Sequence, residues 1–242
     1  MSSNQHNIDV LIVEKKDDVY LTVDCDPNIQ REISEFFTFY VPGYKFMPAF
    51  RNRMWDGKIR LFSQKFKEIY FGLYPYIKAF AEERGYQIVV GKNVDIDNKV
   101  DREVVKKFSN SLGQKFEARD YQIDAIYHSL KFNRTLLLSP TASGKSFIIY
   151  ALIRYYTHLL KDKPNSRCLV IVPTTSLVEQ MYSDFKIYGW DVKKNCHKLY
   201  SGYSNITDKK VLISTWQSLY RLKKEYFEQF GIVFGDEAHL FK

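Results

Sequence analysis

One segment has the residue types and spacing of a loop that binds phosphate. Residues 139–146 read S-P-T-A-S-G-K-S, between an apolar run and a long amphipathic pattern. Successive backbone N–H groups and the positive end of a following helix form a cradle for an anion. In such a cradle Lys145 would reach the β- and γ-phosphates, and the Ser146 hydroxyl would bind Mg²⁺. Ser139 replaces the first glycine of the general pattern G-x-x-x-x-G-K-[ST], whereas Gly144 is kept.

Two adjacent carboxylates supply the second part of a metal–phosphate site. Asp236 and Glu237 follow the apolar run 232–234, which predicts a strand. A carboxylate at the end of a parallel strand lies where ligands bind in open α/β sheets. Asp236 would hold Mg²⁺ through water, and Glu237 would polarise the attacking water. Either part alone also occurs by chance, but a metal–phosphate site needs both.

The elements that must position these residues alternate between strand and helix from residue 119 onward. We expect helices over residues 120–130, 145–160 and 175–188, and strands over residues 135–138, 168–172, 198–200, 211–214 and 232–234. Apolar strands that alternate with helices are typical of a parallel sheet covered on both faces. The sequence therefore predicts an α/β lobe over residues 118–242.

The first hundred residues predict a small α+β domain. We expect a hairpin of strands over residues 10–13 and 19–23, a helix over 27–37, strands over 58–62 and 69–73, a helix over 75–83 and a strand over 86–90. The polar stretch 93–98 marks a boundary. The domain would thus span residues 1–97, and a connector with a helix over 102–109 would span residues 98–117.

Composition excludes several classes of protein. Of the 242 residues 45% are hydrophobic and 26% are charged, as in globular proteins, which excludes a disordered or collagen-like chain. The net charge of +8 favours a polyanionic partner such as nucleic acid. Cys25, Cys168 and Cys196 are far apart in the sequence, which predicts free thiols rather than a zinc site or disulfides. The absence of a signal sequence and of long apolar stretches predicts a soluble protein without a membrane span.

Basic and aromatic residues alternate between residues 41 and 80, where eight basic side chains stand against two acids. Basic side chains neutralise phosphates, and exposed aromatic rings stack on unpaired bases. A tight turn at residues 55–57 would present the Trp55 ring among its basic neighbours. We therefore expect DNA contacts from Arg51, Arg53, Trp55, Lys58 and Arg60. The alternative is that most of these rings form the core of the small domain.

The sequence resembles superfamily-two DNA helicases in several motifs that occur in the order of that family. D-E-A-H at 236–239 resembles their ATPase box, and the loop at 139–146 resembles their first motif. P-T-T-S-L-V-E-Q at 173–180 and S-T-W-Q-S-L at 214–219 resemble two later motifs, and R-D-Y-Q at 119–122 resembles their upstream glutamine motif. The resemblance implies a RecA-like P-loop NTPase lobe with a DEAH box.

The same resemblance implies roles for individual residues. It implies that ATP is bound by Arg119, Tyr121, Gln122, Pro140, Thr141, Ala142, Ser143, Gly144, Lys145 and Ser146. It implies contacts to the DNA backbone from Pro173, Thr174, Thr175, Gln180, Thr215 and Gln217, although a threonine at a helix start is more often only an N-cap. His239 would couple this lobe to another.

The N-terminal part of the sequence indicates one family within the superfamily-two helicases. Residues 43–62, G-Y-K-F-M-P-A-F-R-N-R-M-W-D-G-K-I-R-L-F, resemble the N-terminal domain of the UvsW family of phage recombination helicases. That family implies ATP-dependent unwinding and remodelling of branched DNA, such as Holliday junctions, stalled forks and R-loops, in recombination, repair and replication. We expect a monomer that acts in the cytoplasm of the phage host.

The sequence contains no counterpart of the second motor lobe of such helicases, which carries an arginine finger. Because an arginine finger accelerates phosphoryl transfer by about 10³–10⁵, we expect an N-terminal fragment that hydrolyses ATP slowly by itself. The alternative is a DNA-binding module with an incomplete ATP site, inactive without a separate second lobe. A third interpretation is the motor of a restriction or chromatin-type translocase, against which the element at 55–57 argues.

Overall fold

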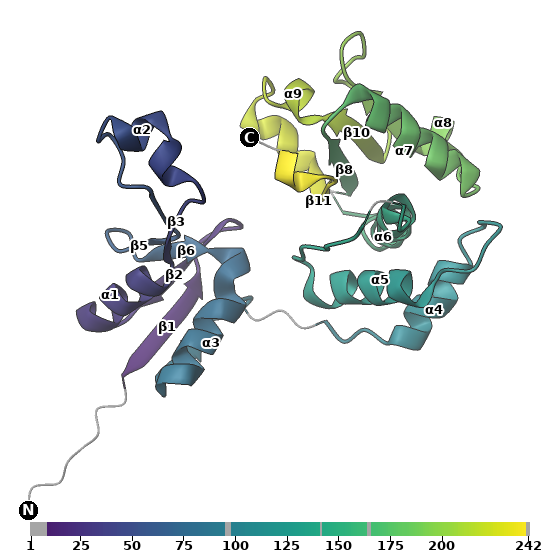
Figure 1. The fold of residues 1–242 in the computed structure, drawn as a ribbon. Coiled ribbons are helices and arrows are strands. Elements are labelled where there is room, and N and C mark those ends of the chain that lie inside the picture. The colour runs from purple at the N-terminus through teal and green to yellow at the C-terminus, as the bar shows by residue number, and fades with distance from the viewer. Residues whose placement is uncertain (1–8, 95–97, 141, 164–165, 241–242) are drawn as a thin grey trace, which may run out of the picture. The chain divides into compact units, whose positions relative to one another are not determined.

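The structure is a computed structural model that describes residues 9–94, 98–140, 142–163 and 166–240. The chain divides into two compact units, residues 1–97 and residues 98–242, each with its own hydrophobic core (Figure 1). The predicted fold class is confirmed, since the first unit is α+β and the second contains a parallel sheet. None of the helices in the described ranges has the length and apolar character needed to cross a membrane.

The first unit is built on a mixed five-stranded sheet. Its strands are β1 (Val10–Lys15), β2 (Tyr20–Asp24), β5 (Phe62–Ser63), β6 (Glu68–Tyr70) and β7 (Gln87–Val90), in the order β5-β6-β2-β1-β7. The predicted hairpin is confirmed, because β1 and β2 pair in antiparallel register. The helices α1 (Pro27–Phe36) and α3 (Tyr74–Arg84) bury Ile33 and Phe80 against the inward-facing residues of the sheet.

A separate two-stranded ribbon projects from this unit. Strand β3 (Thr38–Tyr40) pairs in antiparallel register with β4 (Lys58–Arg60), and the chain between them forms the 3-10 turn η1 (Tyr44–Phe46) and the short helix α2 (Pro48–Arg51). Figure 1 shows that the ribbon carries α2 away from the five-stranded sheet. We call residues 41–57 the ribbon tip.

Two of the predicted strands in this unit have the wrong bounds. The predicted strand 58–62 is two strands in two sheets, because β4 pairs with β3 in the ribbon whereas β5 pairs with β6 in the five-stranded sheet. The predicted strand 69–73 ends at Tyr70. The next residues form the 3-10 turn η2 (Phe71–Leu73), which leads into α3.

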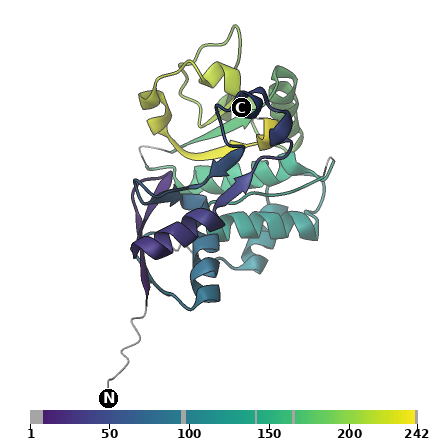
Figure 2. The ribbon, with the colours of Figure 1, turned by 60° about the vertical axis from the view of Figure 1, so that its left-hand side comes forward.

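The second unit carries four parallel strands. They are β8 (Arg167–Val172), β9 (Cys196–Leu199), β10 (Val211–Thr215) and β11 (Phe230–Gly235), in the order β11-β8-β10-β9. The helices are α4 (Arg102–Asn110), α5 (Asp120–Phe132), α6 (Lys145–Leu159), α7 (Thr175–Ile187), α8 (Val192–Asn195) and α9 (Trp216–Leu219), with 3-10 turns η3 (Lys224–Gln229) and η4 (Ala238–Leu240). The predicted connector residues pack within this unit, where α4 lies along α5 (Figure 2).

Both faces of the inner strands β8 and β10 are buried, as predicted for a parallel sheet. On one face Val170 and Ile213 pack in a core with α5, α6 and α7. On the other face Leu169 and Leu212 pack with Leu219 and residues of η3. Because β8, β10 and β11 run parallel, their carboxyl ends meet at one edge of the sheet.

The predicted strand 135–138 is wrong. These residues pair with no strand, and Leu136 and Leu138 are 77% and 91% exposed. Strand β11 is the outermost strand of the sheet, and its Val233 is 58% exposed. An apolar segment becomes a strand only when a neighbouring strand accepts and donates its hydrogen bonds. In the described part of the chain, residues 135–138 pair with no strand and stay outside the sheet.

Candidate functional site

The predicted phosphate loop leads directly into α6. Gly144 is the residue before the helix and has a left-handed backbone (φ +80°). A Cβ atom at this position would lie 2.3 Å from Gln122 Nε2. The left-handed backbone favours glycine here, and a larger residue would also displace the Gln122 side chain. Ala142 also has a positive φ (+63°), so the loop makes a sharp turn before the helix begins. Thr141, which we also predicted to bind ATP, lies outside the described residues.

The residues of the glutamine motif, at the start of α5, form hydrogen bonds with this loop. Gln122 accepts a hydrogen bond from the N–H of Arg119 (3.0 Å) and donates one to Ser143 O (3.0 Å). The Tyr121 hydroxyl donates to Ser143 O as well (2.9 Å). A hollow of about 420 Å³ borders these residues and is lined by Arg119, Tyr121, Ala125, Leu137, Leu138, Ser139, Pro140, Ala142, Ser143 and Ile148. The two segments predicted to bind ATP, residues 119–122 and the phosphate loop, thus come together around one cavity.

The acidic pair stands at the carboxyl end of β11, beside the loop. The N–H of Asp236 donates to Ile171 O (2.9 Å), which fixes Asp236 against the end of β8. Glu237 Oε1 lies 2.5 Å from Lys145 Nζ, so the acidic pair and the loop are in direct contact. This ion pair lowers the pKa of Glu237 and raises the pKa of Lys145. Burial raises the pKa of Asp236, and the positive charge of Lys145 opposes this effect.

His239 lies next to this ion pair. Its Nδ1 is 3.5 Å from Glu237 Oε2, and its side chain is largely exposed. The exposed position is compatible with the predicted role between lobes, which stays a prediction.

Sequence reasoning missed the partner of Ser146. The Ser146 hydroxyl lies 2.8 Å from the Tyr188 hydroxyl, just after α7. Tyr188 packs edge-on against Phe147 and Phe116. A tyrosine 42 residues after the loop belongs to no local pattern, so only the fold reveals this contact.

The predicted DNA-contact residues of this unit gather at the carboxyl ends of β8 and β10. Thr174 caps α7, since its hydroxyl accepts from the N–H of Leu177 (3.3 Å). The Gln217 side chain donates to Pro173 O (3.5 Å), which links the two strand ends. The exposed members of this set are Thr174, Thr175, Gln180 and Gln217, and the buried ones are Pro173 and Thr215. The Thr215 hydroxyl bonds the Ser218 hydroxyl at the start of α9.

In the first unit the predicted DNA-contact residues lie in the ribbon tip and in the adjoining strand β4. The Trp55 indole N–H donates to Lys58 O (2.9 Å), and Lys58 Nζ lies 4.9 Å from the centre of the Tyr40 ring. Arg60 forms an ion pair with Asp56. Arg51 and Arg53 are exposed and line a hollow of about 610 Å³.

Comparisons with known proteins match both units. The family model described as type III restriction enzyme, res subunit, matches residues 115–242, and that described as DNA helicase UvsW, N-terminal, matches residues 9–91. The ATP-dependent DNA helicase uvsW of Enterobacteria phage T4 is 34% identical over 230 residues, which are 91% of this chain and 45% of that protein. The Endoribonuclease Dicer homolog 2 of Arabidopsis thaliana is 34% identical over 76 residues, 29% of this chain and 5% of that protein.

Two solved structures have the same fold. A crystal structure of the UvsW helicase from bacteriophage T4 superposes with a TM-score of 0.82 and 32% identity over 96% of this chain and 84% of that chain. A second crystal structure of T4 UvsW gives a TM-score of 0.82 and 33% identity over 95% of this chain and 47% of that chain. The chain therefore spans about half the length of the phage T4 relative.

Proposed function

Because the chain belongs to the UvsW family of DNA helicases, we propose that it provides the ATP-binding motor lobe and a DNA-binding unit of an ATP-dependent DNA helicase. The observation that carries this proposal is the direct contact between Lys145 and Glu237. This contact supports the proposal, because a phosphoryl-transfer site would need both residues at the edge of a parallel sheet, where ligands of such folds bind.

The residues of this edge suit ATP and Mg²⁺. Asp236 is partly buried and burial raises its pKa, so its negative charge lacks full solvation and a cation would stabilise it. A carboxylate and the Ser146 hydroxyl are the hard oxygen ligands that Mg²⁺ prefers, together with phosphate oxygens and water. Asp236 and Ser146 would hold the Mg²⁺, which would neutralise negative charge on the phosphates.

The side chains of the chain itself would divide the remaining work. Lys145 would turn from Glu237 to the phosphates, since a triphosphate carries more negative charge than one carboxylate. Glu237, thus released, would accept a proton from the attacking water. The backbone N–H groups at the start of α6 would hold the phosphate oxygens, and Arg119 and Tyr121 would border the base.

The substrate we propose is branched DNA, namely Holliday junctions, stalled forks and R-loops. The basic ribbon tip and the polar edge formed by Thr174, Thr175, Gln180 and Gln217 support contacts to the DNA backbone, which carry little sequence information. We propose that the protein works as a monomer in the cytoplasm of the phage host, together with a second motor lobe that supplies the arginine finger.

Competition binding tests the substrate. Fluorescence anisotropy with a labelled fork, at one fixed salt concentration, would measure displacement by unlabelled junction, R-loop and linear duplex of equal length. We expect branched competitors to displace the fork at lower concentration than linear duplex. Equal displacement by all competitors would contradict the branched substrate.

A second candidate is a DNA-binding module whose ATP site is incomplete. The observation that favours it is the unpaired segment 135–138, because the phosphate loop then lacks a strand that anchors it from the N-terminal side. Titration of this chain with a fluorescent ATP analogue separates the two candidates. Binding that requires Lys145 supports the motor lobe, and DNA binding without nucleotide binding supports the module.

A further inference from the structure

The ribbon tip folds around a small aromatic cluster. The Tyr44 ring stacks on Tyr40 with centroids 4.6 Å apart and meets Phe50 edge-on at 4.8 Å. A Cβ atom on Gly57 would lie 2.3 Å from the Tyr44 ring, so the chain packs tightly on the other side as well. The indole N–H of Trp55 is bound within the same turn. These ring contacts hold the tip together, and the rings of Tyr44, Phe50 and Trp55 are only partly exposed.

Two other apolar side chains of the tip are left outside this cluster. Phe46 is 85% exposed and Met54 is 80% exposed, more than any other large hydrophobic residue of the described part of the first unit. Apolar surface left in water forgoes about 25 cal/mol per Å² of stabilisation. Two such side chains on one ribbon tip are available for contact with another molecule.

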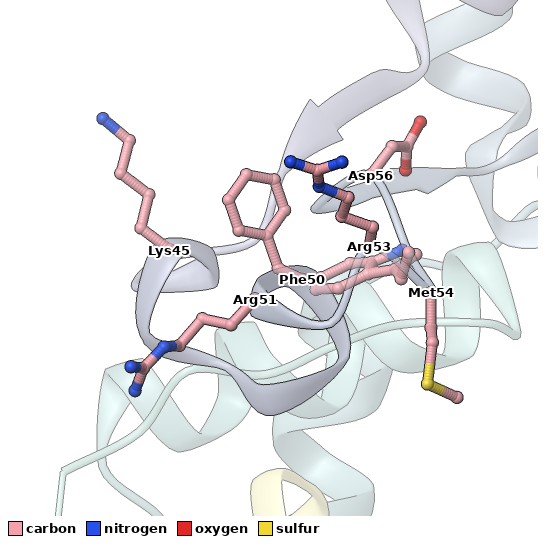
Figure 3. A pocket seen from close by; sticks show the side chains of 7 residues that line it. Lys45, Phe50, Arg51, Arg53, Met54 and Asp56 are labelled. Atoms are coloured by element: carbon pink, nitrogen blue, oxygen red, sulfur yellow. The ribbon is translucent and has the colours of Figure 1, made fainter.

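The hollow of the ribbon tip, which Met54 lines, is also lined by three cationic side chains. Figure 3 shows Lys45, Arg51 and Arg53 around the Phe50 ring, with the Lys45 and Arg51 side chains extending outward. None of these three cations forms an ion pair with a residue in the described ranges. Asp56, the acid that lines the hollow, is paired with Arg60. The hollow can therefore take an anion without breaking an existing ion pair of those cations.

We propose that the ribbon tip binds the end of a DNA duplex where it opens into single strands, with Phe46 and Met54 against the last base pair and Lys45, Arg51 and Arg53 on the adjoining phosphates. This inference rests on the proposed function, that the chain binds branched DNA. A base pair at a fork exposes a flat apolar face, whereas the pairs within a duplex cover one another. Phe and Met are side chains that wedge against base steps in other DNA-binding proteins, and cations beside them match the phosphates.

The combination of cationic and apolar side chains on the ribbon tip distinguishes a fork from a continuous duplex. Cations alone would bind any part of a duplex about equally, because the phosphates repeat along it. Apolar side chains add affinity only where a base face is open. Loss of Phe46 and Met54 should therefore remove the preference for forks and leave the binding of linear duplex intact.

The test uses the full chain and a fork that carries 2-aminopurine in the last base pair. The wild-type chain should raise 2-aminopurine fluorescence on binding, because Phe46 and Met54, wedged against the last base pair, would push that base out of the stack. Phe46→Ala combined with Met54→Ala should abolish the rise and reduce the affinity for the fork, measured by anisotropy, by about five-fold or more. The affinity for linear duplex should stay unchanged.

Phe66 offers a matched control. It is 60% exposed in the same unit, with Lys65 Nζ 5.2 Å from its ring centre, and it lies between β5 and β6 rather than on the tip. Phe66→Ala should behave as the wild type. Phe46→Trp, which keeps a flat apolar ring, should preserve the fluorescence rise. The exposed positions leave folding intact, which circular dichroism can verify.

The outcomes separate this inference from the proposed function. If the double variant keeps the fluorescence rise and the preference for forks, the inference is wrong while DNA binding stands, and the tip serves another partner. If the wild-type chain binds neither fork nor duplex, the inference and the proposed DNA binding both fall.

Discussion

Lys145 Nζ lies 2.5 Å from Glu237 Oε1, so two side chains 92 residues apart in the sequence form an ion pair at the edge of the parallel sheet. The pair lowers the pKa of Glu237 and raises that of Lys145, which keeps both side chains charged. Without nucleotide, the group proposed to bind phosphate and the group proposed to accept a proton thus neutralise each other. Phosphate binding would have to separate them.

Glu237→Gln removes the competitor of the phosphates and the proton acceptor together. We expect the affinity for ATP to stay the same or rise, and hydrolysis in the complete motor to fall by about 10²–10⁴. Nucleotide titration and single-turnover hydrolysis measure the two effects. Glu225→Gln changes an exposed carboxylate of the same unit and is the control. A hydrolysis rate that survives Glu237→Gln would assign the proton acceptor elsewhere.

Lys145→Ala removes the cation of the phosphate loop. We expect the variant to lose ATP binding, because Glu237 is left without its partner and repels the phosphates. Most DNA binding should persist, since it uses other residues. A fluorescent ATP analogue and a labelled fork measure both in one preparation. Lys186→Ala, at an exposed lysine in the last turn of α7, controls for the change of net charge. Unchanged ATP affinity in Lys145→Ala would refute the site.

The basic residues near the ribbon tip should determine how DNA binding depends on salt. Replacement of Arg51, Arg53, Lys58 and Arg60 by alanine should flatten the slope of log K against log salt by up to about 0.9 for each lost phosphate contact. Arg60→Ala alone should have the smaller effect, because Arg60 already pairs with Asp56. Arg31→Ala, on the exposed side of α1, is the control. If the slope stays the same, DNA contacts belong to the second unit alone.

Much of the site could be predicted because its signals are local. The run S-G-K-S places a left-handed glycine before a helix, and α6 begins at Lys145. The acidic pair follows an apolar run, and β11 ends at Gly235, directly before it. In both cases a few neighbouring residues determine the conformation, so the sequence pattern is sufficient.

The failures involve contacts between distant residues. The apolar run 135–138 has the composition of a strand, but a strand also needs a neighbour, which no local pattern reports. The contact between Ser146 and Tyr188 was not predictable for the same reason, because the two residues are far apart in the sequence. In the ribbon tip, the local pattern does not report that Lys58 O binds the Trp55 indole N–H, or that Phe46 and Met54 are the most exposed large apolar side chains there.

Two glycines of the ribbon tip form a matched pair for a test of its packing. Gly57 and Gly43 both have left-handed backbones, with φ of +80° and +72°, but only at Gly57 would a Cβ atom meet another group, the Tyr44 ring at 2.3 Å. Both alanine variants bear the backbone strain of about 1–2 kcal/mol. Gly57→Ala should lose about 1–3 kcal/mol more through overpacking. Urea unfolding measures the difference, and equal losses would show that Tyr44 does not pack there.

The thiols should react slowly in the folded protein. Burial raises the pKa of Cys168 and Cys196 to about 12 and that of Cys25 to about 11. Since the thiolate is the reactive form, a higher pKa leaves less of it at pH 8. We expect no fast reaction with a disulfide reagent at pH 8, and reaction of all three cysteines after unfolding. Fast reaction of any of the three thiols in the folded protein would contradict the packing around that cysteine.

The most direct test of the proposed motor is ATP turnover with and without forked DNA, measured on this chain and on the chain joined to a second motor lobe. We predict that the chain alone binds ATP and turns it over slowly, and that the joined form is stimulated by the fork and silenced by Glu237→Gln. A joined form that is folded, as judged by its thermal unfolding, but hydrolyses no ATP in the presence of forked DNA would contradict the account.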